Sequence, residues 1–175
     1  MASIEDKIRE AQQELAGKLR QLPPIIGEEV VNFALDNFQR EAWQSSGAHP
    51  WQKRKNPTKW GKKDEEGRAL LVKTGKLKRS IRVGAIRDDK VSIIAGGADV
   101  PYAKAHNEGF QGLVHQHVRE HFRTTRQMKN IRVKAHDRTI FQNIPKRQFI
   151  GNWNESPELA ERINQAIREV LNQKL

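Results

Sequence analysis

The sequence predicts an α+β domain in which N-terminal and C-terminal helices pack on a mostly antiparallel sheet with a long, projecting, basic β-hairpin. Two observations support this class: apolar residues recur at helical spacing near both ends of the chain, and apolar and polar residues alternate in its middle. At 175 residues the chain is long enough for one domain with a modest core. The predicted segments are helices in 1–43, a basic loop in 44–69, a sheet core in 70–109, a basic hairpin in 110–144 and a C-terminal helix in 145–175.

The first segment is predicted to form two helices separated by a pair of prolines. Apolar residues at helical spacing predict a helix over residues 4–21, and Ser3 is suited to cap its start. Pro23 and Pro24 should end this helix, because proline has no backbone N–H and its ring clashes with the preceding turn. A second helix is then expected from residue 24 or 25 to about residue 43. Its buried stripe would consist of Ile26, Val30, Phe33, Ala34 and Phe38.

A long basic loop is predicted to follow. Residues 44–68 lose all periodicity and are rich in glycine, proline and lysine, and a loop of this length often has a functional role. Trp51 and Trp60 are exceptions in this polar stretch. We favour their packing onto the domain's own core, and contact with a neighbouring subunit is the alternative.

The middle of the chain is predicted to form short turns and strands. Residues 74–81 read as a helical turn, and residues 82–86 and 91–95 read as two strands with Asp88 and Asp89 in the turn between them. A further helical turn is expected over residues 101–108, closed by a glycine. After the hairpin, Ser156-Pro157-Glu158 should begin the last helix. Its apolar stripe is Leu159, Ile163, Ala166, Ile167, Val170 and Leu171.

Residues 112–142 show the clearest local pattern, which predicts the hairpin. Strict alternation divides the first strand into two faces. One face holds Val114, Gln116, Val118, Glu120 and Phe122, and the other holds His115, His117, Arg119, His121 and Arg123. The second half repeats the first, since residues 118–123 resemble residues 133–138. Few residues elsewhere could cover both faces, so we expect the hairpin to contact another subunit.

The net charge of +11 is concentrated in two blocks. Residues 51–82 carry twelve basic and three acidic side chains, and residues 110–148 carry nine and two. Such blocks indicate an anionic partner, either nucleic acid or an acidic protein surface, although ordinary solvated loops are the alternative. There is no cysteine, and no apolar run approaches the roughly 18 residues that span a bilayer, so neither a disulfide framework nor a membrane partner is expected.

No pattern of residues predicts catalysis, a cofactor or a metal. His115, His117 and His121 could share a face with His136 nearby, but no clustered carboxylate completes a zinc site. The pair His106-Asn107 lacks the second metal-binding histidine and the general base of a His-Asn-His nuclease. We therefore predict no catalytic residues, no metal site and no cofactor.

Three short elements resemble the motifs of the phage virion morphogenesis family, which comprises tail-completion proteins of Mu-like and P2-like phages and prophages. They are the strings LLVKTGKLKRSI at 70–81, VPYAKAHNEG at 100–109 and IPKRQFIG at 144–151. Their order and distances fit the family, and the resemblance covers most of residues 30–171. The motif residues expected to be structural are Thr74, Gly75, Leu77, Ser80, Tyr102, His106, Asn107, Gly109, Arg147, Phe149 and Gly151.

The resemblance implies a structural protein of the virion, located in the tail or neck region and in the host cytoplasm during assembly. It implies an oligomeric ring, expected to be a hexamer, at the head-proximal end of the tail, with the tail tube or sheath and the neck or connector proteins as neighbours. The residues expected to contact these partners are Trp51, Trp60, Arg119, Arg123, Arg132, Lys134 and Arg138. The alternative is a sequence-independent nucleic-acid-binding protein that uses the same hairpin, and a ring whose lumen touches DNA would combine the two.

Overall fold

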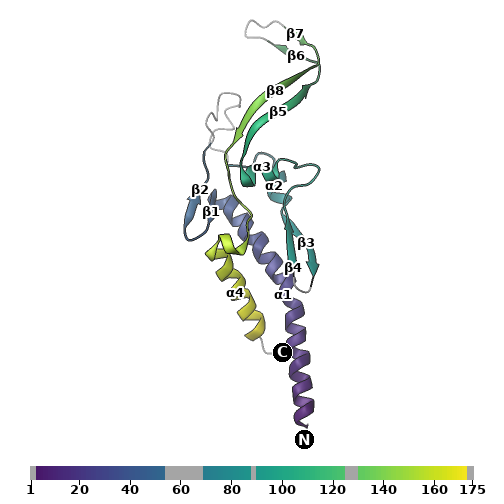
Figure 1. Ribbon diagram of the computed structural model, residues 1–175, viewed down its shortest axis with the longest axis vertical. Coiled ribbons are helices and arrows are strands. Elements are labelled where there is room, and N and C mark those ends of the chain that lie inside the picture. Colours follow the sequence, from purple (N-terminus) through teal and green to yellow (C-terminus); the bar gives the residue numbers. More distant parts are fainter. Residues whose placement is uncertain (1–2, 54–68, 88–89, 125–129, 173–175) are drawn as a thin grey trace.

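One long helix forms the axis of the molecule. The computed structural model describes residues 3–53, 69–87, 90–124 and 130–172, and α1 (Ile4–Arg40) runs through the lower part of the elongated molecule (Figure 1). Ser3 caps its start: the Ser3 hydroxyl accepts a bond from the backbone N–H of Asp6, whose carboxylate accepts one from the backbone N–H of Ser3. Glu41, in the left-handed conformation, ends the helix.

The prediction that Pro23 and Pro24 separate two helices was wrong, because both lie inside α1. Proline has a helical φ angle, so two adjacent prolines remove two backbone bonds without forbidding the helix. Packing of the second half of α1 against α4, β3 and β4 stabilises the helix beyond the prolines. The helix axis changes direction near its middle, as expected where prolines interrupt the bonding (Figure 1).

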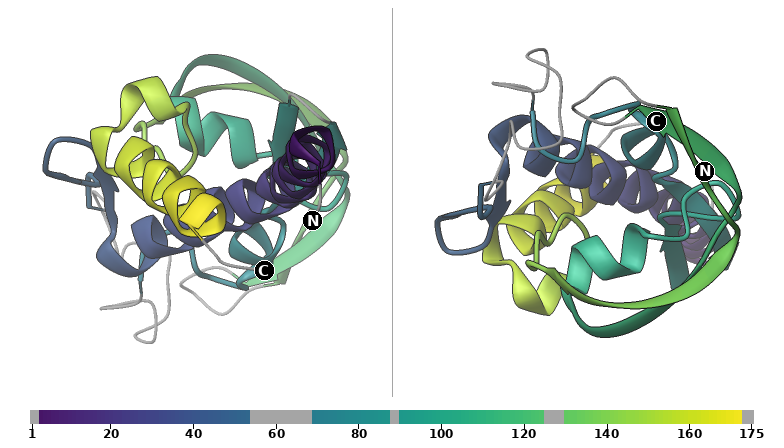
Figure 2. Two further views of the ribbon diagram at one scale, coloured as in Figure 1. Left: turned by 90° about the horizontal axis from the view of Figure 1, so that it is seen from below. Right: turned by 90° about the horizontal axis from the view of Figure 1, so that it is seen from above.

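The C-terminal helix packs beside α1, and a small core lies between them. Helix α4 (Pro157–Asn172) starts where the sequence predicted, and it lies side by side with α1 when the molecule is viewed along its long axis (Figure 2). Phe33, Trp43 and Leu159 form this core, with the first two rings edge to face at 5.5 Å. Arg162 of α4 bonds Asp36 of α1 at 2.7 Å across the same contact.

The strands are antiparallel, as predicted, and form four small pairs in the described parts of the chain. They are β1 (Ala42–Gln44) with β2 (Ala48–Pro50), β3 (Arg82–Arg87) with β4 (Lys90–Ile94), β5 (Phe110–Val118) with β8 (His136–Ile144), and β6 (His121–Thr124) with β7 (Asn130–Val133). The two strands predicted over 82–95 are confirmed, and Asp88 and Asp89 lie outside the described residues. The helix ends at Arg40, three residues before the predicted end at about residue 43. The predicted loop begins only after residue 50, because β1 and β2 lie within residues 42–50.

The main core lies where the middle of the chain returns to the end of α1. It is centred on Phe38, whose ring centroid lies 5.4 Å from that of Trp51 and 5.1 Å from that of Phe149. Two short helices, α2 (Lys76–Arg79) and α3 (Ala103–Glu108), each insert one buried residue, namely Leu77 and Ala103. A 3₁₀ turn, η2 (Trp153–Glu155), connects this region to α4. The class is therefore α+β, with helices at both ends of the chain.

The contact between α1 and α4 can be tested through Leu159, which is 1% exposed. Leu159→Ala should lower the free energy of unfolding by about 2–5 kcal/mol, since it leaves a cavity against two aromatic rings. Leu171→Ala in the same helix, at 39% exposure, is the matched control and should cost less than about 1 kcal/mol. Equal losses from the two variants in urea denaturation would contradict this packing.

Candidate assembly site

The segment that follows β8 crosses the centre of the molecule as extended chain, and other elements bind its backbone. The N–H groups of Phe149 and Ile150 both donate to Asn107 Oδ1, at 3.0 Å each. The N–H of Arg147 donates to the carbonyl oxygen of His106 at 2.8 Å. The second and third family-like motifs therefore bind each other directly. We call residues 147–150 with their bonding partners the motif junction.

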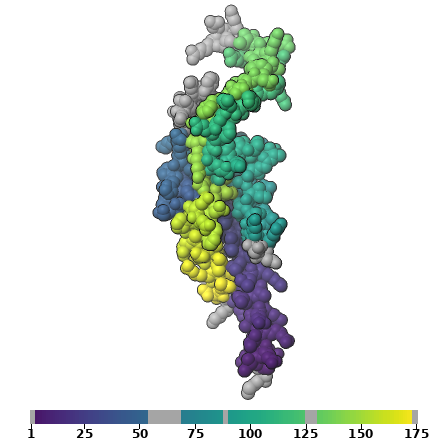
Figure 3. Space-filling model, viewed as in Figure 1, coloured from purple at the N-terminus to yellow at the C-terminus, as the bar shows by residue number. Residues whose placement is uncertain are grey.

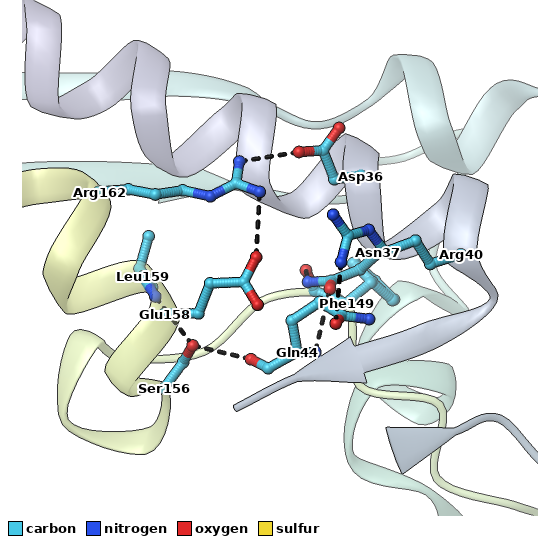
Figure 4. A network of polar contacts seen from close by, with 9 residues as sticks. All are labelled: Asp36, Asn37, Arg40, Gln44, Phe149, Ser156, Glu158, Leu159 and Arg162. Carbon is cyan, nitrogen blue, oxygen red and sulfur yellow. Dashed lines mark hydrogen bonds and ion pairs between the residues drawn. The ribbon is translucent and has the colours of Figure 1, made fainter. Parts of the chain in front are cut away.

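Two further side chains bind the opposite side of this backbone. Trp51 Nε1 donates to the Gln148 carbonyl oxygen at 2.9 Å, and Asn37 Nδ2 donates to the Phe149 carbonyl oxygen at 3.3 Å. The Asn37 Oδ1 in turn accepts the N–H of Gln44 (Figure 4). Sequence reasoning missed Asn37, which is fully buried. Its signal was a polar residue within the apolar stripe of α1, between Ala34 and Phe38.

A small polar network continues from this point to the start of α4. Ser156 Oγ donates to the Gln44 carbonyl oxygen at 2.7 Å and accepts the N–H of Leu159 at 3.0 Å (Figure 4). Ser156 is completely buried, so both of its bonds form away from water. This hydroxyl both caps α4 and ties it to β1.

Two of the motif glycines are required by close approaches at the junction. Gly109 has a φ of 81°, and a Cβ there would lie 3.1 Å from the backbone nitrogen of Lys146. A Cβ on Gly151 would lie 2.8 Å from the Trp43 ring and closer still to Glu155 and Gln148. A larger residue at either position would displace the crossing segment.

The first family-like motif forms the turn around α2. Gly75 adopts a φ of 69°, Leu77 is buried, and Thr74 Oγ1 accepts a long bond of 3.4 Å from the N–H of Lys76. Ser80 Oγ donates to the Leu77 carbonyl oxygen and accepts the N–H of Gly96, which ties the turn to the end of β4. Leu77 and Phe149 belong to the same core cluster. All three motifs therefore converge on one packed region.

Arg147 and His106 place two ionisable groups beside the junction. Arg147 is 7% exposed, and its Nε donates to the Gln52 carbonyl oxygen at 2.9 Å. Burial, and secondly the positive charge of Arg147, lower the pKa of His106 below its ordinary value. The ring of His106 packs edge to face on Tyr102 at 5.8 Å, and its Nδ1 has no hydrogen-bond partner among the described residues. This histidine is therefore packed as a neutral ring.

The cations predicted to bind partners fall into two groups. Arg132 forms two bonds of 2.9 and 3.0 Å with the Glu120 carboxylate, and Arg138 donates to Gln116 Oε1, which the register places directly opposite. The exposed side chains of Arg119, Arg123 and Lys134 have no bond to another described side chain. Trp51 packs in the domain's own core, which is the placement that we favoured from the sequence. Trp60 lies outside the described residues.

The four histidines of the strand pairs each bond a protein group through Nδ1. His115 bonds Thr139, and His117 bonds Asp137 at 2.8 Å. His121 and His136 bond the carbonyl oxygens of the residues two positions earlier, at the break between the two strand pairs. These two matching bonds reproduce the internal repeat seen in the sequence. Across the described ranges, no three histidine or acidic side chains are grouped as a metal would require.

Comparison with known proteins agrees with the motifs. The whole chain, residues 1–175, matches the model of the phage virion morphogenesis family. No curated protein and no solved structure matches the chain. None of the helices in the described ranges has the length and apolar character needed to cross a membrane.

The motif junction can be tested by Asn107→Ala. This change leaves the N–H groups of Phe149 and Ile150 without their acceptor, at a cost of about 1–3 kcal/mol for each group that stays buried. Amide hydrogen exchange at these two residues should accelerate together with the loss of stability. Asn152→Ala is the matched control, since its side chain makes no capping bond. Unchanged exchange at residues 149 and 150 in Asn107→Ala would contradict the assignment.

The neutral state of His106 predicts a pH dependence of stability. Because its pKa is lower in the folded chain than the ordinary value of 6.5, the unfolded chain binds the proton first as pH falls. The contribution of His106 to stability is therefore complete above pH 6.5 and decreases as pH falls from there through the folded pKa. His106→Gln should reduce the loss of unfolding free energy between pH 7 and pH 5. An NMR titration of the wild-type His106 ring with a midpoint at or above 6.5 would disprove this.

Proposed function

Because the chain belongs to the phage virion morphogenesis family, we propose that it is a non-enzymatic structural subunit that completes or terminates the phage tail or joins it to the head. In this proposal, copies form a ring at the head-proximal end of the tail, next to the tail tube or sheath and the neck proteins. The observation that carries the proposal is the motif junction. Its motif residues are used for packing and backbone bonding, as expected of a scaffold.

We propose a non-enzymatic role because the polar residues that could have been catalytic already bind or pack against other parts of the chain. Asn107 is occupied by two backbone bonds, and His106 packs against Tyr102 beside a buried arginine. Arg147 is bonded to the backbone of Gln52. A nuclease would need such groups directed together at a substrate.

The strand pairs β5–β8 and β6–β7 provide the surface for partners in the virion. They extend away from the helices at the opposite end from the N-terminus (Figure 1). Leu113 and Phe141 lie opposite each other on one face, at 65% and 61% exposure. Arg119, Arg123 and Lys134, which bond no other side chain among the described residues, lie farther along the same strand pairs. An acidic protein surface with an apolar centre would match this combination.

Nucleic-acid binding is the second candidate, and one observation favours it. Phe122 is 70% exposed and lies opposite Arg132 in the register of β6 and β7, so an aromatic ring and a cation share one face. Bases could stack on such a ring. Trp51 is buried in the core and is therefore unsuited to stacking on bases. Binding to single-stranded DNA that weakens steeply with salt would support this candidate.

Deletion of the gene from its phage or prophage, followed by electron microscopy of the lysate, tests the tail role. Filled heads beside unattached or overlong tails are expected, and tail length separates termination from joining. Intact particles would contradict the proposal. Loss of DNA replication with no particles at all would favour the nucleic-acid candidate.

Complementation of that deletion tests the surface. A variant with Arg119, Arg123 and Lys134 changed to glutamate should fail to restore joined particles, because reversed charge repels an acidic partner. The matched control changes Arg82, Arg87 and Lys104, which are exposed cations outside the β5–β8 and β6–β7 pairs, and should restore them. Restoration by the first variant would exclude these cations as the partner surface.

A further inference from the structure

The first turns of α1 carry an apolar stripe that nothing in the described chain covers. All residues from 4 to 16 are exposed, and we call this stretch the arm. Ile4, Ile8, Ala11 and Leu15 lie on one face of it at spacings of four, three and four residues. The exposed fractions of the three large side chains are 78%, 53% and 50%. The arm projects past the end of α4 (Figures 1 and 3).

An arm of this length is a weak helix by itself. At about 1.5 Å per residue it extends about 20 Å, and isolated helices shorter than about 12–15 residues are marginal in water. The capping box at Ser3 stabilises its first turn, but Gly17 weakens its base. A partner that covers the apolar stripe would stabilise it.

An apolar groove lies farther along the same helix. Its volume is about 780 Å³, with α1 as its floor, α4 as one wall, and β4, the end of α3 and the segment after β8 as the others. Its apolar lining includes Leu22, Ile26, Val91 and Ile163. Trp153, at 58% exposure, lies at its edge. A helix with apolar residues on one face fits a groove of this kind.

We propose that the arm of one copy lies in the groove of a neighbouring copy. This inference rests on the proposed function, in which copies of the chain associate. The arm is the continuation of the helix that forms the groove's floor, so it cannot enter its own groove without breaking α1. Because arm and groove are different surfaces, the contact is heterologous, and such contacts generate rings when the rotation closes.

The charges of arm and groove are complementary. The arm has four acidic and two basic side chains. Lys90 and Lys146 line the groove, and neither has an ion pair with another described residue. Of the two acidic lining residues, Glu108 pairs with Lys104 at 3.9 Å, and Glu155 accepts a bond from the neutral Gln148 amide at 2.7 Å, so two lysines stand against one uncompensated carboxylate. An acidic helix therefore suits this groove better than the basic strand pairs would.

A coiled coil between two arms is the competing arrangement, and the sequence disfavours it. Continuing the spacing of the stripe places Lys18 at the next seam position, where it bonds Glu14 and the Leu171 carbonyl oxygen. The apolar seam therefore covers about two heptads, and stable coiled coils usually need at least three or four.

The test uses two kinds of variant of the full chain, one with a damaged arm and the other with a damaged groove. Ile8→Ser/Leu15→Ser damages the arm, and Trp153→Glu damages the groove at an exposed position, with Leu22→Gln as a second groove variant. Gln13→Ser/Ala16→Ser, outside the apolar stripe of the arm, is the matched control. Analytical ultracentrifugation should show association weakened at least about 100-fold in each damaged variant and unchanged in the control. Thermal unfolding of the body should match the wild type in all of them.

Mixing the two damaged variants decides the arrangement. The arm variant keeps an intact groove and Trp153→Glu keeps an intact arm, so the mixture should form one-to-one pairs and nothing larger. Normal assembly of the groove variants with failure of the arm variant would indicate paired arms and overturn the inference. Rings formed by every variant would also overturn it and leave the proposed function standing. A wild-type chain that remains monomeric would overturn both the arm contact and the ring, while the deletion phenotype tests the tail role separately.

Discussion

The fold depends on a stretch of backbone that has no strand partner. Residues 147–150 cross the middle of the molecule, and buried N–H and C=O groups without partners would each be costly. Asn107, Asn37 and Trp51 supply those partners from three different parts of the chain. The same bonds therefore connect α1, α3 and the segment after β2, which share no ladder. Side-chain bonds to one crossing segment do here what a continuous sheet does in other α+β domains.

Because the core lies in the middle of the molecule, both of its ends extend away from the core. The core clusters lie around the second half of α1 and the crossing segment, whereas the arm and the strand pairs lie beyond them (Figure 1). Large apolar side chains remain exposed at both ends, including Ile4 on the arm and Phe122 on β6. Monomeric proteins rarely leave large contiguous apolar patches uncovered, and the proposed assembly would cover these side chains.

Local sequence patterns predicted the helices and strands that depend on neighbouring residues. The predictions failed where the structure depends on contacts between residues distant in sequence. The capped start of α1, the start of α4 and the strands around residues 82–95 follow from spacing and capping residues alone. The prolines at 23 and 24 misled because tertiary packing outweighed two missing backbone bonds. The role of Asn37 could not be derived, since it depends on which distant backbone approaches it. Likewise, the pairing of Arg138 with Gln116 follows only once the register is known.

The two extended ends differ in chemistry, and this difference separates their proposed roles. The arm is acidic and apolar along one face, which suits a groove that the chain itself provides. The strand pairs are basic, and the acidic arm of the chain is already assigned to the groove in this proposal. In the proposed ring, the arm would therefore make the contacts between identical copies, and the strand pairs would contact a different molecule. Because the hydrogen-bonded motif junction lies between the two ends, each copy that joins through its arm would present its strand pairs in the same orientation. A ring would then offer the next component of the virion a repeated basic surface, for which a single copy would be too small.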